Sequence, residues 1–392
     1  MCKFLFADGE DVCLYDGGKI IRQHSKYIEK FKAAADNVER SKSWKHSGEG
    51  AAFRGDVNPH GAREDIAAVI NGVYFTSEEG EAVYSFKAGS VSGIYKMKLG
   101  DVKSEETHVI NSVDYEFCGG CLDAGAGTLA TKITKNYLNS DIAVLDLKNG
   151  DYKTVTDGDT LDSDPFVCPQ DSNIIYFSSR GVGRTLNGDF AGYSNSAIYR
   201  LNISALEVEE IAASDKYNYI KPMLFDNTLF AVRTPCKEKK TNPIVEILLI
   251  PFRIIQALAN FINVFVTAFT GKSLASGGEN PAKGREYDSR KEYIKGNLIN
   301  VEKETKKNAK KDKEDYGFVP LGWQLVDVRS GKVVKSGVAD YDITEDGTFI
   351  VTNGRRIFAV KDGKSRKLCN AERCFYVACP HRSEKGDGLF GF

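Results

Sequence analysis

The chain has 392 residues, a formal net charge of -1, and hydrophobic and charged fractions of 42% and 27%. This length exceeds one small domain and suits two ordinary domains or one large closed all-β domain, and the near-neutral charge excludes a global attraction to nucleic acid. The 22 Phe and 18 Tyr favour β-strands.

The N-terminal residues predict three short strands separated by turns, KFLFADG, DVCLYDGG and KIIRQHS. The first apolar run is too short for a secretory signal, and an odd count of nine irregularly spaced cysteines argues against a disulfide framework. We therefore expect a cytoplasmic protein with reduced thiols.

Short pieces that resemble one another follow along the chain. Each begins with Gly, Asn or Asp at a tight turn and continues into an apolar strand. These pieces are NGVYFTS (71–77), AGTLATK (126–132), SNIIYFSS (172–179), DNTLFAVR (226–233) and DGTFIVTN (346–353).

A second, alternating element follows each piece and ends in another turn. These elements are SGIYKMKLG (92–100), SDIAVLDLKNG (140–150), SAIYRLNIS (196–204), GWQLVDVRSG (322–331) and RIFAVKDG (356–363). Four strands per repeat of about 40–55 residues are typical of a β-propeller blade, because such sheets bury both faces only by packing radially.

The repeats predict an all-β, six-bladed β-propeller. The N-terminal blade has only three strands of its own, and RCFYVACP (Arg373–Pro380) offers the missing one. We expect this C-terminal strand to join the N-terminal blade and close the ring.

The stretch from Asp162 to Gly183 follows an Asp-x-x-Pro, turn, apolar-strand and Ser-x-Arg-x-Gly pattern, with Arg180 one place off its most usual position. In this respect the chain resembles the TolB-like six-bladed propellers, relatives of the WD-repeat family. The residues that match are Pro165, Ile175, Phe177, Ser179 and Arg180. The resemblance implies a central channel and use as a protein-interaction platform, and it implies no chemistry.

A long insertion interrupts the fifth blade. The sequence predicts a first propeller part (1–236), an inserted apolar helix with a Lys-rich flexible segment (237–315), a second propeller part (316–382) and a flexible tail (383–392). Within the insertion, residues 242–274 combine a narrow polar stripe with an otherwise apolar helical surface. The residues predicted to dock are Ile247, Leu248, Phe252, Ile255, Leu258, Phe261, Ile262, Phe265 and Phe269.

Such a helix must lie against something apolar. It could dock onto a partner protein or a second copy, lie in a membrane interface, fold onto its own propeller, or cross a membrane. A single crossing conflicts with the topology, because it would separate the two halves of one blade. The Lys-rich segment 303–313 could add attraction to anionic lipid, and its simplest interpretation is a solvated tether.

Two cysteine motifs have spacings that could support chemistry. CGGC (Cys118–Cys121) has the spacing of redox motifs but lies on a predicted strand, and CNAERCFYVACPH (Cys369–His381) could hold zinc only if residues on opposite strand faces converged. We therefore predict no metal and no cofactor.

The sequence also lacks a Gly-x-Ser-x-Gly elbow and a phosphate-binding loop. The overall prediction is a non-enzymatic interaction scaffold that binds no nucleic acid. Two alternatives stay open, a membrane-associated sensor and an enzyme or ligand binder that uses the channel mouth. The C-terminal tail is a further possible docking element, because a groove in a partner could bind its apolar residues Leu389, Phe390 and Phe392.

Overall fold

The structure is a computed structural model that describes residues 2–42, 67–101, 103–135, 138–185, 187–236 and 291–380. Two units make up the chain, Met1–Cys236 with Tyr293–Phe392, and Lys237–Glu292. The first unit contains the sheets described below.

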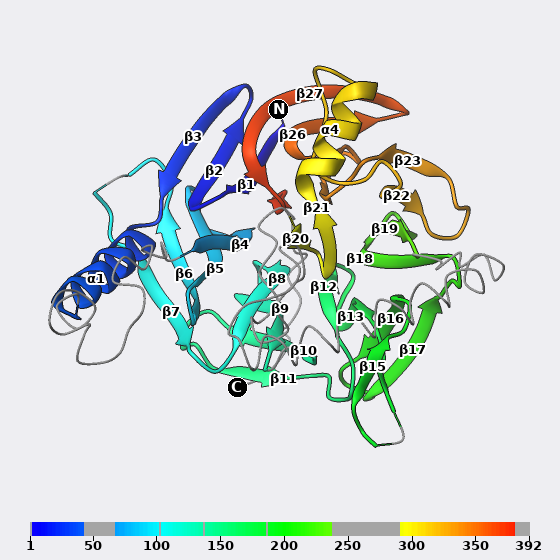
Figure 1. The fold of residues 1–392 in the computed structure, drawn as a ribbon, viewed down its shortest axis with the longest axis horizontal. Helices are drawn as coiled ribbons and strands as arrows, with labels where there is room; N and C mark the ends of the chain where they lie inside the picture. The colour runs from blue at the N-terminus through cyan, green and yellow to red at the C-terminus, as the bar shows by residue number, and fades with distance from the viewer. Residues whose placement is uncertain are drawn as a thin grey trace, which may run out of the picture. The chain divides into compact units, whose positions relative to one another are not determined.

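Six four-stranded antiparallel sheets form a ring of blades (Figure 1). Blade one contains β28 (Val377–Ala378), β1 (Lys3–Asp8), β2 (Asp11–Asp16) and β3 (Lys19–His24). Blade two contains β4 (Ala68–Phe75), β5 (Glu81–Ala88), β6 (Val91–Lys98) and β7 (Thr107–Ser112). Blade three contains β8 (Glu116–Asp123), β9 (Thr128–Thr134), β10 (Ser140–Asp146) and β11 (Tyr152–Thr154).

The remaining three blades follow the same order from the inside outward. Blade four contains β12 (Ser163–Cys168), β13 (Asp171–Ser179), β16 (Ala197–Asn202) and β17 (Glu207–Ala212). Blade five contains β18 (Tyr217–Phe225), β19 (Thr228–Pro235), β22 (Gln324–Asp327) and β23 (Val333–Ser336). Blade six contains β24 (Asp340–Ile343), β25 (Phe349–Thr352), β26 (Gly354–Lys361) and β27 (Lys364–Cys374). The predicted six-bladed propeller is confirmed.

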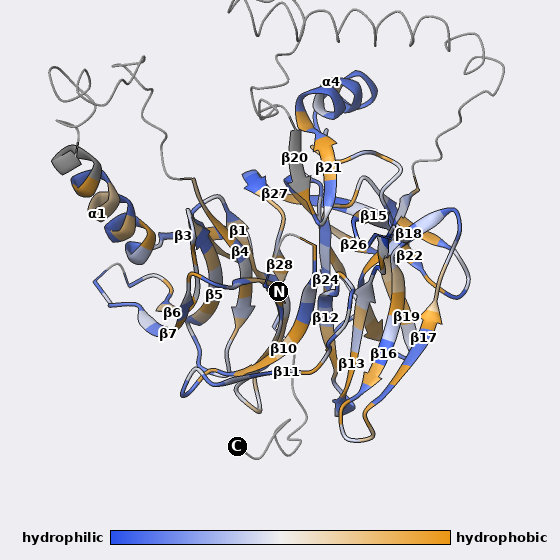
Figure 2. Cartoon of the chain, turned by 60° about the horizontal axis from the view of Figure 1, so that its bottom comes forward, coloured by the Kyte–Doolittle hydropathy of each residue, from blue (hydrophilic) through white to orange (hydrophobic). Residues whose placement is uncertain are grey.

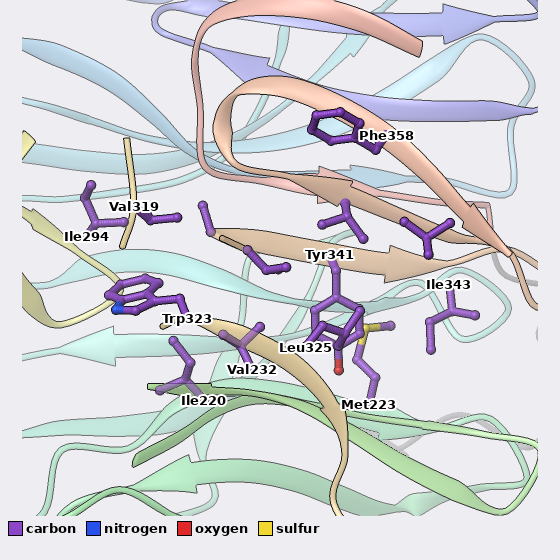
Figure 3. Packing of buried hydrophobic residues seen from close by; sticks show 14 of the residues in the cluster. Ile220, Met223, Val232, Ile294, Val319, Trp323, Leu325, Tyr341, Ile343 and Phe358 are labelled. Atoms are coloured by element: carbon purple, nitrogen blue, oxygen red, sulfur yellow. The ribbon is translucent and has the colours of Figure 1, made fainter. Parts of the chain in front are cut away.

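Each blade buries both of its faces against its neighbours. Between blades five and six, Val232 and Leu325 pack with Tyr341 and Phe358 in one cluster (Figure 3). Burial of a large apolar side chain contributes about 1.5–3 kcal/mol, so stacking of blades is the main favourable term for this fold. The side chains on both faces of each sheet therefore pack against a neighbouring blade.

The ring closes as predicted, by a strand from the end of the chain. In the register of β28 against β1, Val377 lies opposite Phe6 and Ala378 opposite Leu5. The closing strand is shorter than the predicted stretch, because Cys374 still belongs to β27 of blade six. Residues between β27 and β28 make the step from blade six to blade one.

Additional elements occupy the connections on one face of the ring, which we call the insertion face. In an up-and-down blade, connections between the second and third strands share a face with those between blades. The elements are α1 (Lys26–Lys42) after β3, the hairpin of β14 (Val182–Arg184) and β15 (Phe190–Tyr193), and the hairpin of β20 (Lys291–Ile294) and β21 (Asn297–Asn300) followed by α4 (Val301–Lys311) (Figure 2). Helix α1 and the β14–β15 hairpin were not predicted from the sequence.

The segment predicted to be flexible differs in its later part. Residues 291–300 form the β20–β21 hairpin, where a short strand or helix was expected near EYIKGNLINV, and residues 301–311 form helix α4 in place of flexible chain. A Lys-rich composition suits both a tether and an exposed helix. Here the helix gains an N-cap, because the Asn300 side chain accepts a hydrogen bond from the Lys303 backbone N–H at 2.9 Å.

Candidate functional site

The innermost strands of the blades surround the central channel, and four of them contain a β-bulge. The register shifts lie in β4, β8, β12 and β18. In β12 and β18 the bulge contains Asp164 and Lys221, each followed by proline and each with φ of 51°. The left-handed conformation is rare for lysine, and bulges of this kind redirect side chains. The two bulges bring opposite charges into the same channel.

A third charged side chain enters from the β20–β21 hairpin. Its turn residues Lys295 and Gly296 have φ of 48° and 72°, as in the type I′ turn of tight hairpins. The Lys295 side chain is only 5% exposed. Its Nζ lies 3.4 Å from Asp164 Oδ1, 3.2 Å from Asp340 Oδ1, and 4.2 Å from the ring centre of Tyr376. The tip of the hairpin is thus held by two carboxylates and one aromatic face.

Asp340 is the centre of this cluster and its side chain is fully buried. Lys221 Nζ donates to Asp340 Oδ2 at 2.8 Å, and the same oxygen accepts the Val377 backbone N–H at 2.9 Å. Two residues further along β24, Asp342 Oδ2 accepts a hydrogen bond from the Cys379 backbone N–H at 2.8 Å. Blade six therefore holds the closing strand by side-chain carboxylates as well as by apolar packing.

The electrostatics of the cluster favour its charged form. Burial alone raises the pKa of Asp164, but the nearby Lys295 and Lys221 ammonium groups bring that pKa below its ordinary value. Burial acts to lower the pKa of Lys295, but Asp340 and Asp164 raise it above its ordinary value. Asp164 and Lys295 thus stabilise each other in their charged forms.

A cavity of about 60 Å³ lies in the channel next to this cluster. Residues of all six innermost strands line it, together with Lys295. Lining side chains include Tyr74, Phe75, Cys121, Leu122, Phe166, Lys221, Met223, Asp342, Ala378 and Cys379. Ala124, in the turn after β8, also lines it, so the cavity extends toward the face opposite the insertions. The volume suits a few water molecules or a small ligand group.

The CGGC stretch lies on β8 at its bulge, as the strand interpretation predicts. Gly120 has φ of 145°, and a Cβ there would lie 2.2 Å from the Ala130 carbonyl oxygen, so the bulge requires glycine. Burial raises the pKa of Cys118, and it raises that of Cys121 to about 12. A redox role needs a depressed thiol pKa, so this geometry favours two neutral thiols that line the channel.

The C-terminal cysteines pack in the apolar cluster between blades six and one. Cys374 and Cys379 are buried there, and Cys369 packs against the same cluster. Within the residues that the structure describes, no group of three or more His, Cys, Asp or Glu side chains has the arrangement of a metal site.

The predicted docking residues between Ile247 and Phe269 lie outside the described residues, as do the tail residues Leu389, Phe390 and Phe392. In the described part of the chain, no helix combines the length and apolar character needed to cross a bilayer. The channel residues Asp164, Lys221, Lys295 and Asp340 were missed as a group by sequence reasoning. A usable signal existed at two of them, because Asp-Pro and Lys-Pro occur at equivalent places in SDPFVC and IKPMLF.

Neither a family model nor a curated protein matches this sequence. Among solved structures, TolB from Acinetobacter baumannii is similar at a TM-score of 0.47 and 10% identity, over 96% of this chain and 66% of that one. A putative TolB from Agrobacterium tumefaciens is similar at 0.36 and 14%, over 60% and 72%. An oligogalacturonate lyase from Vibrio parahaemolyticus is similar at 0.32 and 10%, over 58% and 56%.

These likenesses concern the fold alone. The six-bladed ring follows from the strand topology of this chain itself, and TolB structures are among the solved structures that it resembles. The six-bladed architecture is thus confirmed by the strand topology.

Proposed function

We propose that this chain is a non-enzymatic protein-interaction scaffold, in which the propeller carries an inserted segment that docks onto a partner protein. The observation that supports this proposal is that the charged side chains in the channel pair with one another. Asp164 and Asp340 contact Lys295, and Lys221 contacts Asp340, so these groups stabilise the return of the insertion into the ring.

The connectivity supports the same proposal. The chain leaves blade five after Pro235 and returns through the hairpin that begins at Lys291. Buried ion pairs fix the end of the inserted segment that returns to the ring. A partner bound to the segment would therefore be attached to a rigid scaffold. The apolar sequence between residues 242 and 274 offers the anchor side chains that a groove in a partner protein would take.

The test is capture of partners from the native cell by the intact chain and by two double variants. Phe261→Glu with Phe265→Glu changes the apolar surface of the segment, whereas Asn260→Ala with Asn263→Ala changes its polar stripe. We expect the first pair to abolish a captured partner and the second pair to retain it. Direct binding of the purified partner to the purified chain, with the same ranking of variants, completes the test.

Two results would contradict the proposal. The first is a set of partners that is unchanged when residues 242–274 are deleted. The second is loss of cooperative unfolding in that deletion, because the segment would then belong to the core of the propeller. Thermal unfolding of the deletion variant distinguishes these results from a true loss of docking.

A small-ligand site in the channel is the second candidate, because Asp164, Lys221, Lys295 and Asp342 line the cavity of about 60 Å³ together with apolar side chains. Pockets of this character bind small molecules when a few polar groups converge. A ligand that raises the unfolding temperature of the native chain, but not of Met223→Trp, which fills the cavity, would favour this function over the scaffold. Absence of any such ligand in a broad metabolite screen would count against it.

The compartment is part of the proposal. We propose that the scaffold works in the cytoplasm, with its nine cysteines as free thiols. Cell fractionation with an antibody against the native chain tests this, and recovery in a secreted fraction would contradict it.

A further inference from the structure

Helix α4, on the insertion face, presents a row of lysines to solvent. Lys303, Lys306 and Lys310 are all exposed, and we call them the basic stripe. Successive residues of a helix turn by about 100°, so these three lie about 140–160° around the helix from Asn308. Asn308 is buried. The basic stripe therefore faces away from the propeller.

The orientation of the helix is held from both ends. Asn308 Nδ2 donates to the carbonyl oxygens of Gly317 and Val319 at 3.0 and 2.8 Å. Asn300 caps the N-terminus, and Val301 packs against the cluster between blades five and six. Because these contacts fix the rotation of α4, the stripe is a preorganised surface rather than a set of independent side chains.

The charge of the region is clearly positive. Residues 301–313 contain six lysines and three acidic residues, which gives a formal net charge of +3 by subtraction. Glu302 pairs with Lys306, but their side chains are 50% and 72% exposed. Exposed pairs of this kind are weak and are screened by salt, so they leave the outward field positive.

We propose that the basic stripe of α4 docks this face of the propeller onto an anionic membrane surface. Lysine clusters on a helix next to an apolar segment are attracted to acidic headgroups, at about 1 kcal/mol for each lysine near the surface. The occupant is argued from charge complementarity, because three exposed lysines on one face of a helix with a net charge of +3 over residues 301–313 match a surface of acidic headgroups. This inference goes beyond the scaffold function, because it specifies where the scaffold is held.

The experiment is co-sedimentation of the full chain with phosphatidylserine–phosphatidylcholine vesicles and with pure phosphatidylcholine vesicles. We expect binding only to the anionic vesicles, and loss of that binding when NaCl rises from about 0.1 to about 0.5 M. Replacing the stripe by Lys303→Gln, Lys306→Gln and Lys310→Gln should reduce partitioning by about 100-fold, from the loss of three attracted charges.

A matched control removes the same charge from the opposite face. Lys148, Lys332 and Lys364 are exposed and lie in or next to turns between the third and fourth strands of blades three, five and six. Their replacement by Gln should leave partitioning within about twofold of the native chain. Equal losses of vesicle partitioning in both triple variants would show that binding follows the net charge of the chain alone, and would overturn the proposal.

Three further results would overturn it. Equal binding to neutral vesicles would assign the interaction to apolar contacts. No binding to anionic vesicles at low salt would remove the membrane as occupant, even if an acidic protein bound the stripe. Salt-dependent binding that disappears on deletion of residues 242–274, but survives the stripe substitutions, would assign it to the deleted segment. Partner capture in the preceding test depends on different residues, so the two proposals can fail separately.

Discussion

The side chain of Asp340, at the start of β24, accepts a hydrogen bond at 2.9 Å from the backbone N–H of Val377 in the closing strand β28. The same carboxylate pairs with Lys221 and Lys295. One buried group therefore joins blade five, blade six, the inserted hairpin and the closure of the ring. The stability of the propeller should depend on this site more than on any surface ion pair.

Replacing Asp340 by Ala should destabilise the fold by about 3–5 kcal/mol, because it leaves two lysines in the channel without their shared partner. Urea unfolding at equilibrium measures the change. Glu209→Ala is the comparison, since Glu209 faces Arg200 at 3.6 Å with a side chain that is 65% exposed. That change should cost less than about 1 kcal/mol. Equal costs would show that the buried cluster has no special weight.

Replacing Lys295 by Met should destabilise the fold by a similar amount, about 3–5 kcal/mol, because Asp164 then loses its nearest ammonium group. Adding Asp164→Asn should restore part of the loss, since both charges of the pair are then removed. The double-mutant cycle measures this coupling by urea unfolding. Strict additivity of the two single changes would contradict a direct interaction. Lys303→Met on the exposed side of α4 controls for the loss of a lysine as such.

Stability should fall in acid in a way that depends on Asp164. Its pKa is lower in the folded chain than its ordinary value of about 4. A depressed carboxyl pKa contributes stability that is present above the unfolded value and is lost as the pH falls through the folded value. The urea concentration at which half of the native chain is unfolded should therefore decrease when the pH is lowered below about 4. Asp164→Asn should show a shallower drop over the same range, and parallel curves would contradict the assignment.

Gly120→Ala should prevent stable folding or cost more than about 3 kcal/mol, because the added Cβ meets the Ala130 carbonyl oxygen at 2.2 Å. Gly127→Ala is the matched control. It also has positive φ, of 68°, but no atom lies within 4 Å of the added Cβ. It should cost only about 1–2 kcal/mol, the strain of the left-handed conformation. Thermal unfolding measures the loss of stability in the two variants. Similar losses would show that the contact of the added Cβ with the Ala130 carbonyl oxygen does not limit residue 120 to glycine.

The channel thiols should react slowly in the folded chain. Burial raises the pKa of Cys118, and it raises that of Cys121 to about 12, so little thiolate forms at neutral pH. Iodoacetamide labelling followed by mass spectrometry measures the reaction, with the unfolded chain as the reference. Rapid labelling of either residue under native conditions, or a Cys118–Cys121 disulfide, would revive the redox interpretation.

Sequence reasoning worked best where the physics is local. A turn residue followed by an alternating strand specifies a hairpin by itself, so stretches such as DGTFIVTN and RIFAVKDG predicted β25 and β26. It failed where two structures share one composition. The lysines of α4 suit a solvated tether equally well, and the buried contacts of Asn308 that hold the helix are made with residues beyond its end.

The sequence by itself determined the number of blades and the origin of the closing strand, because strand alternation and turn chemistry act between near neighbours. Only the tertiary structure decided that Asp164, Lys221, Lys295 and Asp340 meet. These residues come from three blades and a hairpin, and their contact requires the ring curvature together with the bulges that turn Asp164 and Lys221 into the channel. A pattern of period two carries no information about which blades face one another across an axis, and so the charged centre became visible only once the ring was closed.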